Sequence, residues 1–396
     1  MSELPERKII GLYGGSFDPV HKGHVAVARA FIKQFSPEKL IIMPCAVPPH
    51  KAKSVTANDF TRLAMLKAVF SSEKKAEISD FEIRREGVSY TVDTLKELKK
   101  LYPDRRIIMV VGTDMFLTLR SWKNAEEIFL LCDLCVYSRG EFDVETKEYA
   151  AKLRDDFGVI TEFLKGKRID VSSTELREKL AEDKCVSGIF PRSAAKIAAV
   201  SGVYHSKGFK LACYRKAAKK NVDSERYKHI LRVEKAALKL AEYHGADLFK
   251  ARSAALLHDL TKCKTLEEQL NFAKEFGIIG VEEFKKSPKV AHAFTAAGYA
   301  ERYFSVSDSD TLNAVAYHTT GRPDMSLLEK IVFLADSVEE GRDFDGVEEL
   351  RLLAYEDIDG AVLTSLRATK KKIENKGAYL HPLTAQALEF YEKLRG

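Results

Sequence analysis

The sequence predicts two domains of different fold class: an α/β domain with a doubly wound parallel sheet, then an all-α domain. At 396 residues the chain exceeds what one ordinary hydrophobic core supports, so two domains are the default. Between Lys8 and about Val136 short apolar runs alternate with helical stretches, which is typical of parallel sheets. After about Lys207 the periodicity is helical almost throughout. We therefore expect domains at residues 1–207 and 208–396.

The elements of the first domain follow from its apolar runs. The expected strands are Ile9–Tyr13, Leu40–Met43, Ile107–Val111, Leu134–Tyr137 and, as a further possibility, Val159–Phe163. The expected helices between them are Val25–Phe35, Asp59–Phe70, Thr91–Leu101 and Ala125–Leu130. Ligands of such folds bind at the carboxyl ends of the strands, so the loops that follow the strands are the candidate site.

The composition is that of a soluble globular protein, with 45% hydrophobic and 31% charged residues. No apolar run approaches a membrane span, and the first residues lack the apolar core of a signal peptide, so we expect a cytoplasmic protein without membrane contact. A net charge of +6 is too small to indicate nucleic-acid binding, although it suits anionic small substrates. Cys132 and Cys135 form a CxxC without a second pair, which predicts buried thiols and no zinc site.

The stretch from Gly11 to His24, GLYGGSFDPVHKGH, joins an expected strand to an expected helix. A strand, a glycine turn and a helix N-terminus direct backbone N–H groups toward an anion. His21 and His24, with Gly23 between them, add imidazole donors that would stabilise a phosphoryl transition state. The alternative is a tight turn with a capped helix and two solvated histidines.

Two later loops carry further candidates. Lys51 follows two prolines and a histidine after the second expected strand, where it could meet a phosphate or simply end a rigid surface turn. Asp114 follows the strand Ile107–Val111, and Trp122 lies eight residues further on. A tryptophan near a strand end can stack on a flat aromatic substrate, but it could equally belong to the core.

Two expected helix starts also offer donors to an anion. Thr91 is a plausible N-cap with exposed backbone N–H groups beside it. The segment SSTELR at residues 172–177 combines hydroxyl groups, a helix start and Arg177, which together could hold a triphosphate. Ser172 and Glu175 also have the spacing of a capping box, and one helix start can be capped and still bind anions.

The second domain contains an ordered set of histidines and aspartates on separate helical segments. The set is His229, His258, Asp259, His292, His318 and Asp336. Imidazole and carboxylate groups that converge in a helical bundle suit one or two first-row transition metals, and an aspartate beside a histidine can bridge two ions. Each histidine taken alone could instead be a satisfied core or surface residue.

The motifs of the first domain resemble the nucleotidyltransferases that carry HxGH. Over residues 8–205 they resemble nicotinate mononucleotide adenylyltransferase in order and type, although Val47 stands where that family often has asparagine. The resemblance implies that the mononucleotide phosphate attacks the α-phosphate of ATP, that pyrophosphate leaves and that Mg²⁺ arrives with ATP. It implies catalytic roles for His21 and His24. It implies nucleotide or substrate contacts from Gly14, Gly15, Ser16, Phe17, Lys51, Thr91, Asp114, Trp122, Arg139, Ser173, Thr174 and Arg177.

The motifs of the second domain resemble the HD-domain phosphohydrolases. Over residues 223–390 they are similar to the bacterial HD hydrolases of diadenosine tetraphosphate, which implies symmetrical cleavage to two ADP at a dinuclear centre, with iron as the expected metal. The implied ligands are His229, His258, Asp259, His292, His318 and Asp336. The resemblance further implies a catalytic role for Lys262 and phosphate contacts from Thr320, Arg322 and Arg342.

These resemblances predict a bifunctional enzyme whose partners are small-molecule nucleotides: ATP, nicotinate mononucleotide and diadenosine tetraphosphate. Several alternatives stay open. The transferase could use nicotinamide mononucleotide, phosphopantetheine or glycerol phosphate. The HD domain could act on guanosine tetraphosphate or deoxynucleotides, or it could be a silent nucleotide sensor that regulates the transferase. The intact ligand set favours an active hydrolase. Metal identity and a homo-oligomeric state are left open.

Overall fold

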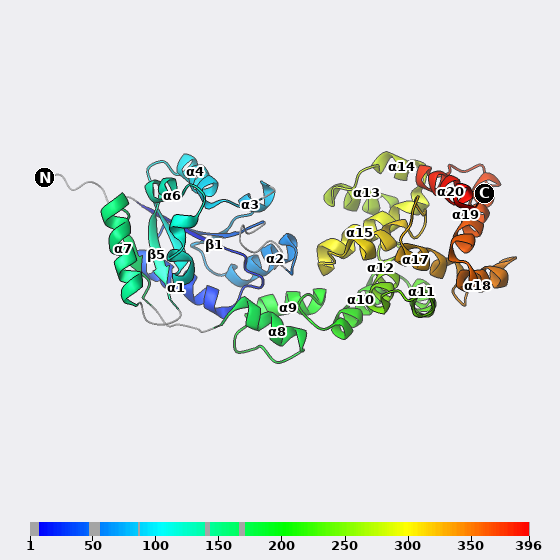
Figure 1. Ribbon diagram of the computed structural model, residues 1–396, viewed down its shortest axis with the longest axis horizontal. Coiled ribbons are helices and arrows are strands. Elements are labelled where there is room, and N and C mark those ends of the chain that lie inside the picture. Colours follow the sequence, from blue (N-terminus) through cyan, green and yellow to red (C-terminus); the bar gives the residue numbers. More distant parts are fainter. Residues whose placement is uncertain (1–7, 47–55, 86–87, 139–142, 166–170, 396) are drawn as a thin grey trace. The chain divides into compact units, whose positions relative to one another are not determined.

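The computed structural model describes residues 8–46, 56–85, 88–138, 143–165 and 171–395. The chain divides into two compact units, Met1–Val200 and Ser201–Gly396 (Figure 1). The boundary that we propose after residue 207 falls at the start of helix α10 (Lys207–Asn221). The predictions for Lys51 and Arg139 lie outside the described residues.

The first unit is built on a six-stranded sheet in which all neighbouring strands are parallel, with the order β3-β2-β1-β4-β5-β6. The strands are β1 (Ile9–Gly15), β2 (Lys39–Pro44), β3 (Ala76–Ile78), β4 (Arg106–Gly112), β5 (Asp133–Tyr137) and β6 (Thr161–Phe163). The order reverses between β1 and β4, and ligands of open α/β sheets bind at such a switch point. The predicted doubly wound sheet is confirmed. Edge strand β3 was not predicted, because three partly exposed residues give no apolar run.

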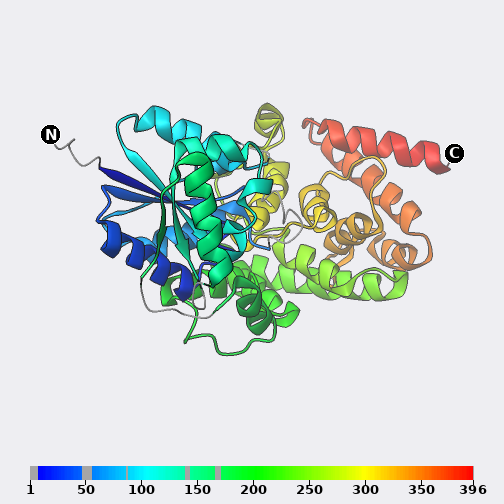
Figure 2. The same ribbon diagram turned by 60° about the vertical axis from the view of Figure 1, so that its left-hand side comes forward.

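Helices cover both faces of this sheet (Figure 2). On one face Ile10 and Leu12 of β1 share a core with Leu95 of α4 (Thr91–Leu101). On the other face Gly11 meets α1 (Lys22–Phe35): a Cβ on Gly11 would lie 2.4 Å from the ring of Phe31, so only glycine admits this packing. The remaining helices are α2 (Asp59–Phe70), α3 (Phe81–Arg84), α5 (Thr113–Phe116), α6 (Ala125–Leu131), α7 (Val144–Phe157), α8 (Ser173–Ala181) and α9 (Arg192–Ser201), with a 3₁₀ turn at Leu119–Ser121.

The described residues of the second unit form helices joined by turns and loops, with no strand among them, as predicted from the helical period. Its helices are α10, α11 (Ser224–His244), α12 (Leu248–Leu257), α13 (Leu266–Glu275), α14 (Val281–Lys286), α15 (Ala291–Phe304), α16 (Ser309–Tyr317), α17 (Leu327–Val338), α18 (Val347–Glu356), α19 (Ile358–Glu374) and α20 (Pro382–Arg395), with a 3₁₀ turn at Pro288–Val290. One continuous apolar core joins α10, α11, α12, α15, α16, α17, α18, α19 and α20.

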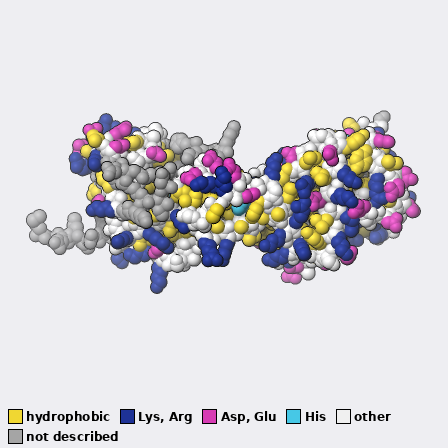
Figure 3. Space-filling view, turned by 90° about the horizontal axis from the view of Figure 1, so that it is seen from below, with side chains coloured by type: hydrophobic (Ala, Val, Ile, Leu, Met, Phe, Trp, Pro, Cys, Tyr) yellow, Lys and Arg dark blue, Asp and Glu magenta, His cyan; other side chains and the backbone are white. Residues whose placement is uncertain are grey.

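The surface carries both signs of charge. On the face drawn in Figure 3, Lys and Arg side chains are interspersed with Asp and Glu, in keeping with the small net charge. Within the described ranges, the structure contains no helix with the length and apolar character that crossing a bilayer requires. Cys132 and Cys135 are buried free thiols, as expected, and burial raises the pKa of Cys135 to about 12.

Candidate functional site

The loop after β1 fixes the two histidines of HxGH through the start of α1. His21 is the N-cap residue, and its Nδ1 accepts a hydrogen bond from the backbone N–H of His24 at 3.3 Å. The Nδ1 of His24 accepts in return from the backbone N–H of His21 at 3.1 Å. The two imidazoles thus form a capping box, a role usually filled by Ser or Thr with Glu.

This reciprocal capping determines the tautomer of both rings. Because each Nδ1 accepts a hydrogen bond, the neutral rings carry their proton on Nε2. The rings of His21 and His24 stack with centroids 3.6 Å apart and an interplanar angle of 22°. The turn therefore presents two parallel imidazoles as Nε2–H donors, which is the arrangement that a developing phosphoryl charge requires.

Close packing holds the two rings in place. A Cβ on Gly23 would lie 2.9 Å from Nδ1 of His21 and 3.2 Å from Val171, so the position excludes a side chain. On the other side Phe17 is buried, and its ring meets that of His24 edge-on at 4.9 Å. The Phe17 side chain thus supports His24, and any direct contact of this residue with a nucleotide would come from its backbone.

Helix α8 docks on the same loop. The hydroxyl of Ser173 donates to the carbonyl of Pro19 at 3.0 Å, and Nη1 of Arg177 donates to the carbonyl of Asp18 at 2.6 Å. Ser172 is the N-cap and accepts from the backbone N–H of Glu175, but no reciprocal bond closes a capping box. Docking brings the N-terminus of α8, with its backbone donors, beside the HxGH turn.

The candidates near β4 and α4 differ in exposure. Asp114 is exposed on the short helix α5, directly after β4. Trp122 is partly buried against the core of the sheet, and its Nε1–H has no hydrogen-bond partner among the described residues. The N-cap expected at Thr91 is corrected: α4 begins at Thr91, the cap position is Tyr90, and no side chain caps the helix. The first N–H groups of α4 therefore lack a capping side chain.

The six predicted metal ligands of the second unit come together at the junction of α11, α12, α15, α16 and α17. Two overlapping groups place their ligand atoms within 4.8 Å of one another: His229, His258 and Asp336, and His258, Asp259 and His318. The sixth residue, His292, lies with its Nε2 3.1 Å from Oδ1 of Asp259 and 3.2 Å from Nε2 of His318.

Hydrogen bonds at Nδ1 again fix the tautomers, here with the opposite result. Nδ1 of His258 and Nδ1 of His318 each lie 2.7 Å from a backbone carbonyl, that of Ala255 and that of Val315. Nδ1 of His229 lies 3.1 Å from Glu339. Because all three Nδ1 atoms donate, each Nε2 keeps a lone pair.

These lone pairs fit a metal. Nε2 of His229 lies 3.0 Å from a carboxylate oxygen of Asp336, and Nε2 of His258 lies 3.2 Å from one of Asp259. Both nitrogens are buried, and neither makes an aligned hydrogen bond within the described residues. Imidazole lone pairs and carboxylates that meet without hydrogen bonds between them form a donor set suited to a divalent transition metal.

Charged groups surround the donor set. Asp259 is buried, which alone would raise the pKa of its carboxyl, but His258 and His292 hold that pKa well below its usual range. The pKa of His318 is lowered to about 3, mainly because the ring is buried and further because His258 and His292 lie nearby. Its imidazole is therefore neutral. Arg226 donates to Asp259 at 3.0 Å, and Arg342 donates to Asp336 at 2.6 Å.

Comparisons with known proteins find a different family in each unit. The cytidylyltransferase-like family model matches residues 12–179, and the HD domain model matches residues 226–341. The chain is 28% identical over 377 residues to a probable nicotinate-nucleotide adenylyltransferase/Ap4A hydrolase of Mycoplasma genitalium, covering 93% of this chain and 100% of that protein. It is 32% identical over 194 residues to a probable nicotinate-nucleotide adenylyltransferase of Clostridium tetani, covering 49% of this chain and 97% of that protein.

The chain belongs to the nicotinate-nucleotide adenylyltransferase family, with an HD domain in its second half. A crystal structure described as a predicted HD superfamily hydrolase involved in NAD metabolism, from Clostridium acetobutylicum, is 37% identical to it. The match covers 46% of this chain and 96% of the chain in that structure, with a TM-score of 0.45.

One predicted phosphate contact of the HD domain, Thr320, is wrong, and a second candidate, Arg322, is already paired within the protein. Thr320 is fully buried, and its hydroxyl donates to the carbonyl of Gly321, so it cannot reach a phosphate. Arg322 forms a two-pronged pair with the buried Glu329, at 2.6 and 2.7 Å, and holds the start of α17. The neighbouring Thr319 faces the donor set instead, with its hydroxyl 3.0 Å from Nε2 of His318.

Other residues that serve the sites were missed. Glu339 accepts from His229 and pairs with Arg232, and its only sequence signal is its position three residues after Asp336. In the adenylyltransferase unit the fully buried Arg62 donates to the carbonyls of Ser16 and Cys45, both at 2.7 Å. It thereby ties together the loops that follow β1 and β2. An arginine inside an expected helix gave no sign of this role.

Proposed function

We propose that the first unit transfers the adenylyl group of ATP to nicotinate mononucleotide, giving deamido-NAD and pyrophosphate. The observation that carries this proposal is the stacked pair His21 and His24 at the sheet's switch point, with both Nε2–H groups as donors. The family of its relatives supports the choice of reaction and mononucleotide.

In the proposed reaction an oxygen of the mononucleotide phosphate attacks the α-phosphorus of ATP. A new P–O–P bond forms, the bond between the α-phosphorus and its bridging oxygen to the β-phosphate breaks, and pyrophosphate leaves. The Nε2–H groups of His21 and His24 stabilise the charge that grows on the α-phosphate oxygens. Ser173, Thr174 and Arg177 hold the outer phosphates, and Mg²⁺ enters with ATP.

A direct assay tests this proposal. The purified full-length protein is given ATP and Mg²⁺ with either nicotinate or nicotinamide mononucleotide, and both dinucleotide and pyrophosphate are measured. We expect equal molar yields of the two products and faster turnover of the acid. Turnover of the amide at an equal or higher rate would overturn the assigned substrate, and the absence of pyrophosphate with both would overturn the reaction.

We further propose that the second unit hydrolyses diadenosine tetraphosphate symmetrically to two ADP with a metal pair. The supporting observation is that the Nε2 lone pairs of His229, His258 and His318 converge with two carboxylates. These residues, with His292, would hold the metal, and we expect iron. When bound, the metal supplies Lewis acidity toward phosphate oxygens and lowers the pKa of water. Nζ of Lys262 lies 3.2 Å from Nε2 of His292, and in this proposal it contacts a phosphate of the substrate.

Elemental analysis paired with product chromatography tests the hydrolase. Wild type should carry a stoichiometric transition metal and release ADP alone. Asp259→Ala should lose both metal and hydrolysis while adenylyl transfer stays normal. The sensor alternative makes the opposite forecast: no hydrolysis by the metal-loaded wild type, and impaired adenylyl transfer in the variant. Release of AMP together with ATP would instead overturn symmetrical cleavage.

A further inference from the structure

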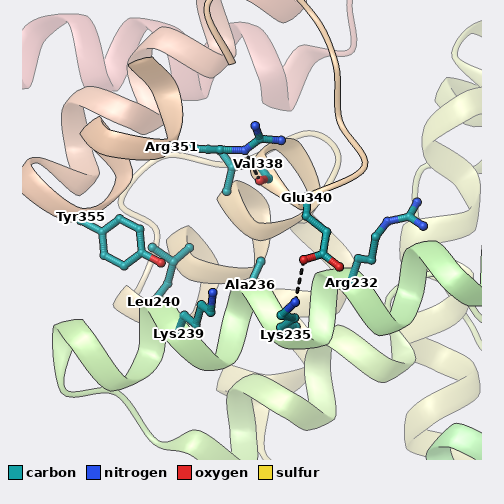
Figure 4. Close-up of a pocket in the computed structure, with 9 residues that line it drawn as sticks. All are labelled: Arg232, Lys235, Ala236, Lys239, Leu240, Val338, Glu340, Arg351 and Tyr355. Atoms are coloured by element: carbon teal, nitrogen blue, oxygen red, sulfur yellow. Dashed lines mark hydrogen bonds and ion pairs between the residues drawn. The ribbon is translucent and has the colours of Figure 1, made fainter. Parts of the chain in front are cut away.

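A pocket of about 310 Å³ lies in the second unit between α11, the segment that ends α17, and α18 (Figure 4). None of the proposed metal ligands lines it. Its volume falls at the lower end of the range for small-molecule sites, about 300–1,000 Å³. The cavity therefore suits one compact ligand rather than a polymer or a lipid surface.

The lining is cationic. Arg232, Lys235 and Lys239 lie on one face of α11, at a spacing that stacks side chains turn above turn, and Arg351 of α18 faces them. Glu340 is the one acidic residue of the lining, and Lys235 pairs with it at 2.7 Å. Arg232 is already paired with Glu339 and Arg351 with Glu348, so the two lysines against Glu340 leave the pocket with a small positive charge.

The basic side chains differ in how far they are already engaged. Arg351 is fixed by the carbonyls of Val338, Glu339 and Arg342. Lys239, by contrast, is exposed and forms no ion pair with any residue that the structure describes. The pKa of the Glu340 carboxyl is lowered, mainly by its hydrogen bond with Lys235 and further by the charges of Arg232 and Lys239. Three cations thus act on one carboxylate. The pocket can accept a further anion at Lys239 without breaking an existing pair.

The opposite wall is apolar. Leu240 is 1% exposed and Val338 is 8% exposed, and the ring of Tyr355 stands beside Leu240 (Figure 4). Tyr243 packs against the edge of that ring at 5.1 Å, which fixes its orientation. The pocket therefore has two sides: an apolar side that suits a flat ring, and a cationic side that suits phosphate.

We propose that this pocket is a separate binding site for a nucleoside diphosphate. Its phosphates lie at Lys239 and the adjacent Lys235, and its base lies against Leu240 and Tyr355. The site is distinct from the adenylyltransferase site and from the metal centre, and it does not depend on either proposed activity.

The methyl groups of Leu240 provide a local probe. In full-length protein with labelled Leu and Val methyl groups, the Leu240 signals are identified by their loss in Leu240→Ile, and ADP, inorganic phosphate and adenosine are titrated. We expect ADP to shift these signals saturably, phosphate to do so more weakly, and adenosine at equal concentration to have no effect. If ADP does not shift the Leu240 methyl signals, or if adenosine shifts them equally, the proposal is overturned.

Charge variants assign the response to the pocket. Lys239→Glu and the milder Lys239→Gln should weaken ADP binding, with at least about a tenfold rise in Kd for the glutamate. Lys371→Glu changes net charge identically at an exposed position outside the lining and should leave Kd unchanged. The unshifted remainder of the methyl spectrum reports intact folding. Equal Kd values in wild type and both Lys239 variants would place ADP elsewhere and refute the site.

Discussion

The two halves of the chain both rely on histidine, yet they prepare it in opposite ways. In the first unit Nδ1 of His21 and Nδ1 of His24 accept hydrogen bonds from backbone N–H groups, so Nε2 is a donor. In the second unit Nδ1 of His258 and Nδ1 of His318 donate to backbone carbonyls, so Nε2 is a lone pair. A helix N-terminus offers N–H groups, whereas a helix C-terminus offers carbonyls. For these four histidines, the end of the helix therefore decides which ring nitrogen carries the proton.

The largest expected effect comes from a variant that keeps the helix cap at position 21 but removes the Nε2–H donor of His21. In His21→Asn the side-chain oxygen can still accept from the N–H of His24, but no Nε2–H remains. We expect kcat for adenylyl transfer to fall about 1,000-fold with an unchanged Tm. His21→Ala should lose the same activity and also about 1 kcal/mol of stability. If His21→Asn keeps most of the activity, the histidine pair is a structural cap only.

The metal side of the comparison depends on the acceptor at Nδ1. Glu339→Ala removes the acceptor of His229 and leaves Arg232 without its partner. We expect metal affinity to fall about 10- to 100-fold, measured by competition with a chromogenic chelator. Glu340→Ala is the matched control, because the adjacent Glu340 pairs with Lys235 and does not contact His229. Equal losses in the two variants would contradict the positioning role of Glu339.

A single methyl group should disturb the stacked pair without removing either ring. Gly23→Ala places a Cβ 2.9 Å from Nδ1 of His21, so the ring must move. We expect adenylyl transfer to fall about tenfold while helix propensity offsets part of any loss in stability. Gly208→Ala is the control: Gly208 also follows a lysine at a helix start, and its added Cβ would meet only Ser206 at 3.9 Å. Unchanged kinetics in Gly23→Ala would show that the ring position is not critical.

The smallest expected effect concerns the cap of α8. Ser172→Ala should cost about 1 kcal/mol, or about 2–4 °C in Tm, and should raise the KM for ATP because the N-terminus of α8 faces the HxGH turn. Asp143 is the equivalent cap of α7, and its side chain accepts a hydrogen bond from the backbone N–H of Thr146; Asp143→Ala removes this cap. It should lower Tm by a similar amount and leave KM unchanged. A matching rise in KM in both variants would indicate general loosening of the unit.

Local pattern was enough to predict much of the fold. Helices α2 and α4 have the predicted bounds, since each has a clear apolar period between turn residues. The strands β1, β2, β4 and β5 were predicted because central parallel strands are continuous apolar runs. Edge strand β3 escaped because it is short and partly exposed.

The candidate sites were predictable only where function depends on the residue type itself. The six histidine and aspartate candidates could be picked out because imidazole and carboxylate groups are typical metal donors, and the structure brings them together. Thr320 was misplaced because a motif does not tell which of two adjacent hydroxyl groups faces inward. The pairing of Arg322 with Glu329 was likewise not visible in the motif. Arg62 was missed because its partners are carbonyls of two distant loops.

The sequence by itself determined the order of the domains, the strands and helices that carry each motif, and the supply of imidazoles and carboxylates in each half. Only the tertiary structure decided which of these side chains meet. The tautomers of His21, His24, His258 and His318 are set by backbone groups three residues away, whereas Glu339 reaches His229 only because the chain folds. The same kind of side chain thereby offers a hydrogen-bond donor in one unit and a lone pair in the other.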